Sequence, residues 1–182
     1  MINNLNKEIG RIKQIMEIND SDLNEVSDEG YQLIKERYSE SKLVMTNKDS
    51  IDVYMGEQKH GFKPHGIWYG IGTSWINWVR NEMPEWEEEH VFKLDVNESE
   101  MLMIHTLEDL YSFTNNYGGS DLVMVKRLIN WNLVANEYGG IEISPYMWQA
   151  RRDRRTWWYY PWDVASGCIW NKETITNIEK IV

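Results

Sequence analysis

The chain of 182 residues has little of several features that define common protein classes. Its single cysteine, Cys168, excludes an intramolecular disulfide and a cysteine-rich zinc site. No apolar run approaches the roughly 20 residues of a transmembrane helix, and the opening stretch MINNLNKEIGRIK lacks the apolar core of a signal peptide. We therefore expect a cytoplasmic protein of one ordinary domain, with no membrane partner.

Basic residues are also few. Lys and Arg number 19 against 29 Asp and Glu, which gives a formal net charge of −10. Since phosphate binding draws on clustered Lys and Arg, such a chain is a poor general binder of nucleic acid. The exception is a local cluster formed by Arg151, Arg152, Arg154 and Arg155. The overall charge thus favours a protein partner, and the cluster keeps RNA as an alternative.

Phenylalanine is scarce, with 3 residues, whereas Trp and Tyr number 10 each. Trp and Tyr combine an apolar face with a polar edge, which suits ligand pockets and interfaces. For any single ring, a place in a core filled by large side chains is the alternative. The set as a whole indicates a planar ligand or a partner surface.

Hydrophobic periodicity and turn signals predict helices and strands mixed along the chain. Helices are expected at 3–18, from an N-cap at Ser27 to Tyr38, after Thr73 or Ser74, after Thr106, at 128–135, and from Asn171 onward. Strands are expected at 42–46, 51–55, 67–70, 90–96, 101–104, 141–143 and 168–170. Most of these strands lie too close in sequence for βαβ crossovers, so the pattern favours an α+β fold. Residues 1–40 form an N-terminal helical segment in this interpretation, and 41–182 form the main domain.

Several catalytic motifs are absent from the sequence. No histidine pair has the i, i+4 spacing of a helical metal site, so no metal is expected. Walker-type and Gly-x-Ser-x-Gly sequences are missing, and the glycines at 66–72 lack dinucleotide-loop spacing. Cys168 stands between a glycine and large apolar residues, which predicts a buried structural thiol. With these motifs excluded, the residues that could form a site are aromatic side chains, carboxylates and glycine-containing turns. Such a set fits glycosyl transfer from a nucleotide sugar, and it equally fits carbohydrate binding without catalysis.

The order of segments over roughly residues 42–181 resembles the ADP-ribosyltransferase superfamily. The run KPHGIWY at 63–69 is similar to the family's second signature strand, and 90–104 to the paired strands that follow. YGGIEI at 138–143 resembles the Tyr-Asp-Gly-Ile element, and CIWN at 168–171 the closing strand. The runs KPHGIWY and WDVASGC also resemble those of uncharacterised bacterial and phage proteins of the ADP-ribosyltransferase type.

This resemblance implies a split β-sandwich of ADP-ribosyltransferase type with flanking helices and an N-terminal helical appendage. It further implies NAD as substrate and transfer of ADP-ribose, with release of nicotinamide, to a macromolecular target, chiefly a protein. Such an activity is typical of a phage or bacterial effector. A phage-encoded protein of this kind would act in the host cytoplasm. The alternative is a non-catalytic inhibitor of the same fold that occludes a host or defence protein.

The resemblance also assigns site residues. Asp163 is the first choice, and Glu142 the second, for the acidic residue that stabilises the oxocarbenium-like state. Tyr69 packs against nicotinamide, and His65 orients the amide or ribose. The residues expected to contact the dinucleotide are Thr46, Lys63, His65, Gly66, Trp68, Tyr69, Trp75 and Arg154.

The first signature strand departs from the family pattern. The family carries an Arg or His there, and residues 42–46 contain neither. Either Thr46 takes that role, or His65 supplies it, or the site is degenerate.

Overall fold

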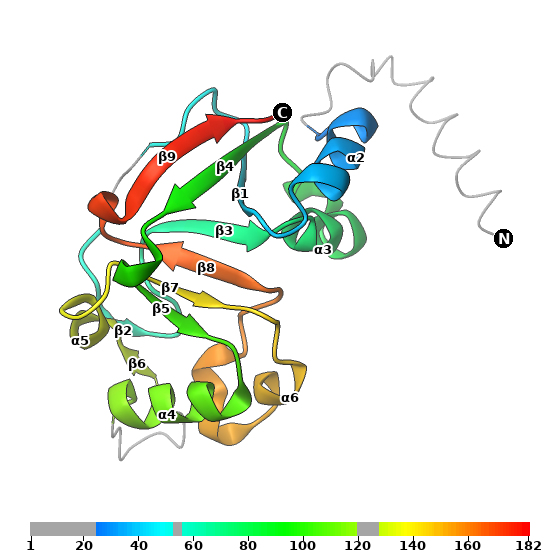
Figure 1. Ribbon diagram of the computed structural model, residues 1–182. Coiled ribbons are helices and arrows are strands. Elements are labelled where there is room, and N and C mark those ends of the chain that lie inside the picture. Colours follow the sequence, from blue (N-terminus) through cyan, green and yellow to red (C-terminus); the bar gives the residue numbers. More distant parts are fainter. Residues whose placement is uncertain (1–24, 53–55, 120–127) are drawn as a thin grey trace, which may run out of the picture.

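The computed structural model of the protein describes residues 25–52, 56–119 and 128–182. These residues form an α+β fold in which a curled sheet is flanked by helices (Figure 1). The predicted helix at 3–18 lies outside the described residues, and so does part of the predicted strand at 51–55. None of the helices formed by the described residues combines the length and apolar character needed to span a bilayer.

The main sheet has seven strands in the order β5-β7-β8-β3-β1-β4-β9. Neighbouring strands are antiparallel except β5 and β7, which are parallel. The strands are β1 (Lys42–Thr46), β3 (Ile67–Ile71), β4 (His90–Val96), β5 (Met101–Ile104), β7 (Gly140–Ile143), β8 (Ser166–Ile169) and β9 (Ile175–Lys180). A separate ribbon pairs β2 (His60–Gly61) with β6 (Ile129–Asn130).

Two helical groups flank the sheet. The first consists of α2 (Asp28–Arg37) and α3 (Ser74–Glu82), followed by the 3₁₀ turn η2 (Pro84–Trp86). The second consists of α4 (Leu107–Tyr117), α5 (Trp131–Ala135), α6 (Trp148–Arg151) and the 3₁₀ segment η4 (Arg154–Tyr159). Shorter 3₁₀ turns, η3 (Glu98–Glu100) and η5 (Lys172–Thr174), precede β5 and β9.

Several predicted elements are confirmed. The strands at 42–46, 90–96 and 101–104 have the expected bounds. Ser27 caps α2, since the Gly30 amide donates to its Oγ at 3.1 Å. Thr106 caps α4 through a reciprocal capping box with Asp109, which satisfies backbone donors at the helix start.

Other predictions are wrong. The last segment is strand β9, not a helix, because it pairs antiparallel with β4 along most of its length. Residues 128–135 begin with strand β6 before the short helix α5. The two strands of 90–104 are not paired with each other, since β4 lies between β1 and β9 while β5 lies at the opposite edge. The closing strand is β9, and β8 lies inside the sheet.

The two faces of the sheet bury different cores. One face carries a cluster that includes Ile67, Tyr69 and Ile169. Successive side chains of a strand point to opposite faces. Leu43 and Met45 therefore pack on the other face, against α2 and α3, and Cys168 packs there within the aromatic core of the second helical group.

Tyr69, Gly167 and Glu142 lie directly opposite one another on β3, β8 and β7. Because Gly167 has no side chain, the Tyr69 ring crosses over it, and the Tyr69 hydroxyl donates to Glu142 Oε2 at 2.8 Å. Lys42 Nζ on β1 lies 2.9 Å from the same oxygen. The Lys42 and Glu142 side chains are only 12% and 7% exposed, so this network ties β1, β3 and β7 together in the interior, across β8.

We expect Gly167→Ala to lower the free energy of unfolding by about 1–3 kcal/mol, because overpacking a dense interior forces side chains out of their preferred positions. A Cβ at this position would lie 2.3 Å from the Tyr69 ring. The matched control is Gly61→Ala on β2, where the nearest atom to the added Cβ is a backbone oxygen at 3.9 Å. Urea unfolding measures both variants, and equal losses in the two would contradict the packing argument.

Candidate functional site

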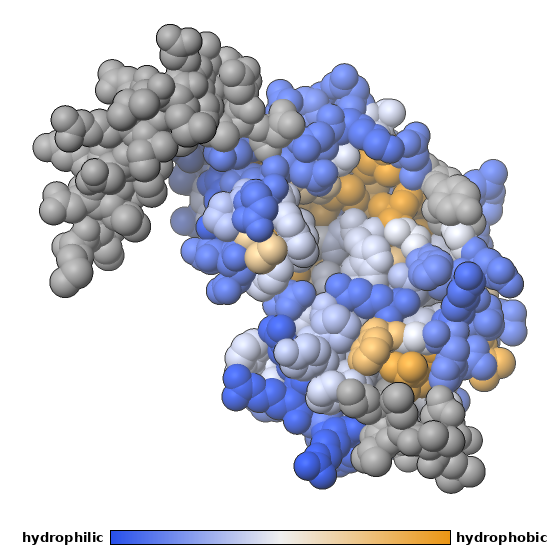
Figure 2. All heavy atoms as spheres, turned by 180° about the vertical axis from the view of Figure 1, so that it is seen from behind, coloured by the Kyte–Doolittle hydropathy of each residue, from blue (hydrophilic) through white to orange (hydrophobic). Residues whose placement is uncertain are grey.

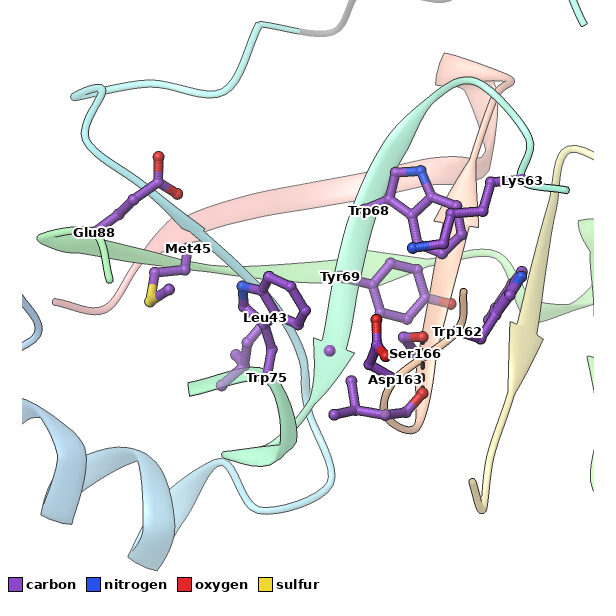
Figure 3. A pocket seen from close by; sticks show the side chains of 12 residues that line it. Leu43, Met45, Lys63, Trp68, Tyr69, Trp75, Glu88, Trp162, Asp163 and Ser166 are labelled. Atoms are coloured by element: carbon purple, nitrogen blue, oxygen red, sulfur yellow. Dashed lines mark hydrogen bonds between the residues drawn. The ribbon is translucent and has the colours of Figure 1, made fainter. Parts of the chain in front are cut away.

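A cavity of about 330 Å³ opens on the sheet face that carries the helical groups, between α3 and the loop leading into β8 (Figure 3). Its lining residues are Leu43, Met45, Lys63, Trp68, Tyr69, Gly70, Trp75, Glu88, Trp162, Asp163, Val164 and Ser166. The volume is at the lower end of the range typical of small-molecule sites. The face shown in Figure 2 is hollowed near its middle, where apolar side chains lie among hydrophilic ones.

The local sequence of β3 explains how the cavity forms. Trp68 and Gly70 alternate with the inward-pointing Tyr69, so they belong to the cavity side of the sheet. A Cβ on Gly70 would lie 2.8 Å from Trp75 Cβ, so only glycine lets α3 approach this closely. Ser74 Oγ then donates to the Ala165 carbonyl at 3.0 Å, which fixes the start of α3 against the loop before β8.

Aromatic rings form the walls of the cavity (Figure 3). Trp68 and Trp162 meet edge to face with ring centroids 4.8 Å apart. Trp75 stacks on Trp78 at 5.0 Å with nearly parallel planes. Because neighbouring rings hold Trp68 and Trp75, these walls are preorganised for a planar ligand.

Charged groups stand around the same cavity. Asp163 Oδ1 lies 3.0 Å from an Arg151 guanidinium nitrogen. The Lys63 ammonium lies 4.8 Å from the Trp68 ring centroid. Partial burial lowers the pKa of Lys63, while the Asp163 charge opposes that shift. Burial also raises the pKa of Glu88. The cavity thus combines an apolar, aromatic lining with two carboxyl groups, of which Asp163 is ion-paired, and with the ammonium of Lys63.

Five predicted site residues line the cavity: Lys63, Trp68, Tyr69, Trp75 and Asp163. Tyr69 contributes little surface, because its residue is 2% exposed and its hydroxyl is bound to Glu142. Burial, followed by the Glu142 charge, raises the pKa of Tyr69 well above its ordinary value, so the phenol stays neutral and donates.

The other predicted residues are not among the lining residues. Glu142 is buried in the network with Tyr69 and Lys42, on the opposite face of β7 from its neighbours Ile141 and Ile143. Thr46 is at the end of β1 and accepts from the Lys48 amide.

His65, Gly66 and Arg154 also lie apart from the lining. The His65 backbone is held by the Gln58 side-chain amide, and its residue is exposed. Gly66 packs against the Ile169 backbone, where a Cβ would collide. Arg154 is exposed.

The sequence did not predict the apolar floor of the cavity, formed by Leu43 and Met45, or the wall formed by Trp162. Leu43 and Met45 lie on β1, and only the sheet register reveals which face they occupy. Trp162 could have been found, because it precedes Asp163 in the segment singled out by the sequence. Its Nε1 is buried with no hydrogen-bond partner among the described residues.

Metal and thiol chemistry find no support at this site. The described part of the chain contains no group of three or more His, Cys, Asp or Glu side chains arranged to hold a metal. Cys168 is free and buried, as predicted, and burial raises the pKa of its thiol well above the ordinary value. A thiol in that state is a poor nucleophile.

Comparisons with known proteins give no relative for this chain. No protein-family model, no curated protein and no solved structure matches it.

The Asp163 carboxylate acts on Lys63 as an electrostatic neighbour. We expect Asp163→Asn to lower the pKa of Lys63 further, because the charge that supports the ammonium is lost. In the native protein the lowered pKa means that folding weakens proton binding at Lys63. The contribution of Lys63 to the free energy of unfolding therefore rises with pH between the folded and unfolded values.

NMR of ¹³C-methylated lysines would measure this shift, with the Lys63 signal assigned by its absence in Lys63→Arg. Asp95→Asn is the matched control, since Asp95 pairs with Lys93 on β4 and does not line the cavity. An unchanged Lys63 titration in Asp163→Asn would contradict the proximity of the two charges.

Proposed function

We propose that the protein binds NAD in this cavity and transfers ADP-ribose to a macromolecular target. The observation that carries the proposal is the convergence of Lys63, Trp68, Trp75 and Asp163 on one aromatic cavity. These residues come from three separate segments of the sequence, and each is a site residue that the resemblance to ADP-ribosyltransferases implies. In this proposal the curled sheet with its flanking helices is the split β-sandwich of that family.

The chemistry of the cavity fits the nicotinamide end of NAD. Nicotinamide in NAD is a planar cation, and indole faces attract planar cations. A volume of about 330 Å³ suits the nicotinamide and its ribose, so the adenylate end would extend outside. Asp163 and Glu88 are the two carboxylates among the lining residues, and Asp163 is the one that follows Trp162 and interacts with Lys63.

In the proposed reaction the bond between nicotinamide nitrogen and ribose C1′ breaks, and nicotinamide leaves with the bonding electrons. Positive charge then develops on C1′ and the ring oxygen, where a preorganised carboxylate lowers the barrier. A nucleophile of the target forms the new bond to C1′ and gives up its proton. Arg151 acts as a positioning residue, since it holds the Asp163 carboxylate at 3.0 Å.

A second function, a non-catalytic binding protein of the same fold, is favoured by one observation. Leu43 and Met45 give the cavity an apolar floor on β1, where the resembling family has an Arg or His. Such a floor can hold an apolar anchor of a host or defence protein without any chemistry.

Titration with NAD separates these two functions. We expect saturable quenching of tryptophan fluorescence, because Trp68, Trp75 and Trp162 line the cavity, together with slow release of nicotinamide. Asp163→Asn should keep the quenching and reduce release by about 10²–10³-fold, the usual cost of losing one group that stabilises transition-state charge. Trp68→Ala should weaken NAD binding.

Asp95→Asn serves as the control for an ordinary surface carboxylate and should release nicotinamide like the unaltered protein. Arg151→Gln removes the partner of Asp163 but keeps the carboxylate, so its loss should be smaller than that of Asp163→Asn. Absence of both quenching and release at millimolar NAD would refute the transferase and leave the binding protein.

A further inference from the structure

A second surface lies beside the cavity, on α6, η4 and the turn that follows. It consists of Trp148, Arg151, Arg152, Arg154 and Tyr160, and we refer to it as the Arg–aromatic surface. Trp148 is 54% exposed and Tyr160 is 48% exposed, which is unusual for rings of this size. The exposed aromatic area and the guanidinium groups occur together in a chain whose overall charge is −10.

The rings of this surface are fixed by their neighbours. The Arg151 guanidinium lies 5.5 Å from the Trp148 ring and 5.3 Å from the Tyr160 ring. Arg152 lies 5.6 Å from the Trp148 ring, and Trp157 stacks in parallel on Tyr160 at 5.3 Å. Each ring is therefore held in place by a contact with a cation or another ring, while about half of its residue surface stays in solvent. Rigid, half-exposed rings offer stacking platforms at low entropic cost.

The arginines of the cluster are not equivalent. Arg155 is paired with Asp153 at 2.6 Å, and Arg151 with Asp163 at 3.0 Å. Arg152 and Arg154 are exposed and form no ion pair within the described residues. These two guanidinium groups are available to bind phosphate, for which Arg has the matching geometry.

We infer that the Arg–aromatic surface binds single-stranded nucleic acid. Unpaired bases have free faces that stack on Trp148 and Tyr160, and the backbone phosphates bind Arg152 and Arg154. A duplex hides its base faces, so the exposed rings would have no role with it. An acidic protein would pair with the arginines and could pack on the rings, whereas each nucleotide of a single strand supplies both a phosphate for an arginine and a planar face for a ring, which is why nucleic acid is the better match.

The position of this surface relates it to the cavity. Arg151 contacts both rings and also Asp163, so a bound strand would lie next to the carboxylate that lines the cavity. We assign to that strand the role of ADP-ribose acceptor, an assignment that rests on the proposed function. A nucleophilic oxygen or nitrogen of the strand would replace nicotinamide at ribose C1′ and release its proton. Binding of the strand does not depend on that reaction.

Fluorescence anisotropy with labelled oligo(U) and oligo(dT) of about 12 nucleotides tests the binding, with a duplex of the same length for comparison. We expect single strands to bind more tightly than the duplex. Trp148→Ala should raise Kd about 5- to 150-fold, which corresponds to the loss of one stacking platform. The matched control is Trp86→Ala, since Trp86 is 51% exposed but belongs to the glutamate-rich segment at η2.

The salt dependence of Kd tests the phosphate contacts. Arg152→Gln combined with Arg154→Gln should lower the slope of log Kd against log salt by about 1.4, because each phosphate contact on a single strand contributes about 0.7. Arg37→Gln, at the exposed end of α2, is the control and should leave the slope unchanged.

Three results would overturn the binding proposal: no binding of either oligonucleotide at low salt, preference for the duplex, or equal Kd values for Trp148→Ala and Trp86→Ala. Binding of poly-glutamate through Arg152 and Arg154 without binding of the oligonucleotides would also overturn it, in favour of an acidic protein.

The acceptor role is tested with NAD labelled in its adenylate half. Label on the bound strand supports it. Strand binding with nicotinamide release but no label overturns the acceptor role alone. If NAD neither quenches the tryptophan fluorescence nor releases nicotinamide, the proposed function is overturned. The strand-binding measurements remain valid in that case, because they do not involve NAD.

Discussion

The hydrogen bond from Tyr69 to Glu142, made across Gly167 and completed by Lys42, is the interaction on which the rest of the sheet depends. It joins β3, β7 and β1 over a strand that contributes only a glycine at that point. A shift of one residue in β3 would exchange its two faces and leave Glu142 without its partner. Removing one member of a buried ionic network is costly, because the remaining charge stays uncompensated. The network therefore strongly favours this register of β3.

That register in turn creates the cavity. With Tyr69 directed into the network, Trp68 and Gly70 must occupy the opposite face, and the bare Gly70 admits the start of α3. The second helical group packs farther along the same face, around an aromatic core that contains Trp131, Trp158 and Trp162. The two helical groups cover different strands of the sheet. Part of β1 and β3 therefore stays uncovered between them, and the cavity lies over that part.

Local signals in the sequence predicted much of this fold, and failures occurred where distant pairing decides. The caps at Ser27 and Thr106 and the alternating strand at 90–96 depend on neighbouring residues, so they were predictable. The isoleucines near the C-terminus have helical spacing, yet pairing with β4 makes that segment a strand and leaves Ile178 36% exposed at the edge.

The site shows the same division. Trp68 and Asp163 are predictable because the short runs KPHGIWY and WDVASGC carry them, whereas the apolar floor of Leu43 and Met45 depends on strand order. The tryptophans together indicate a ligand or partner, but not all of them serve that role. Trp131, Trp158 and Trp170 are buried in the core, whereas Trp162 is buried and also lines the cavity. The ligand argument therefore rests on Trp68, Trp75 and Trp162 in the cavity and on the exposed Trp148.

The Arg151 side chain connects the two proposed sites. The same guanidinium contacts the rings of Trp148 and Tyr160 and forms the ion pair with Asp163. In the proposal the strand phosphates bind Arg152 and Arg154, so Arg151 keeps its ion pair with Asp163 while it also supports both rings. A strand on the rings and a cation in the cavity would then both depend on the position of this one guanidinium. By linkage, any effect of one ligand on the affinity of the other would be equal in both directions.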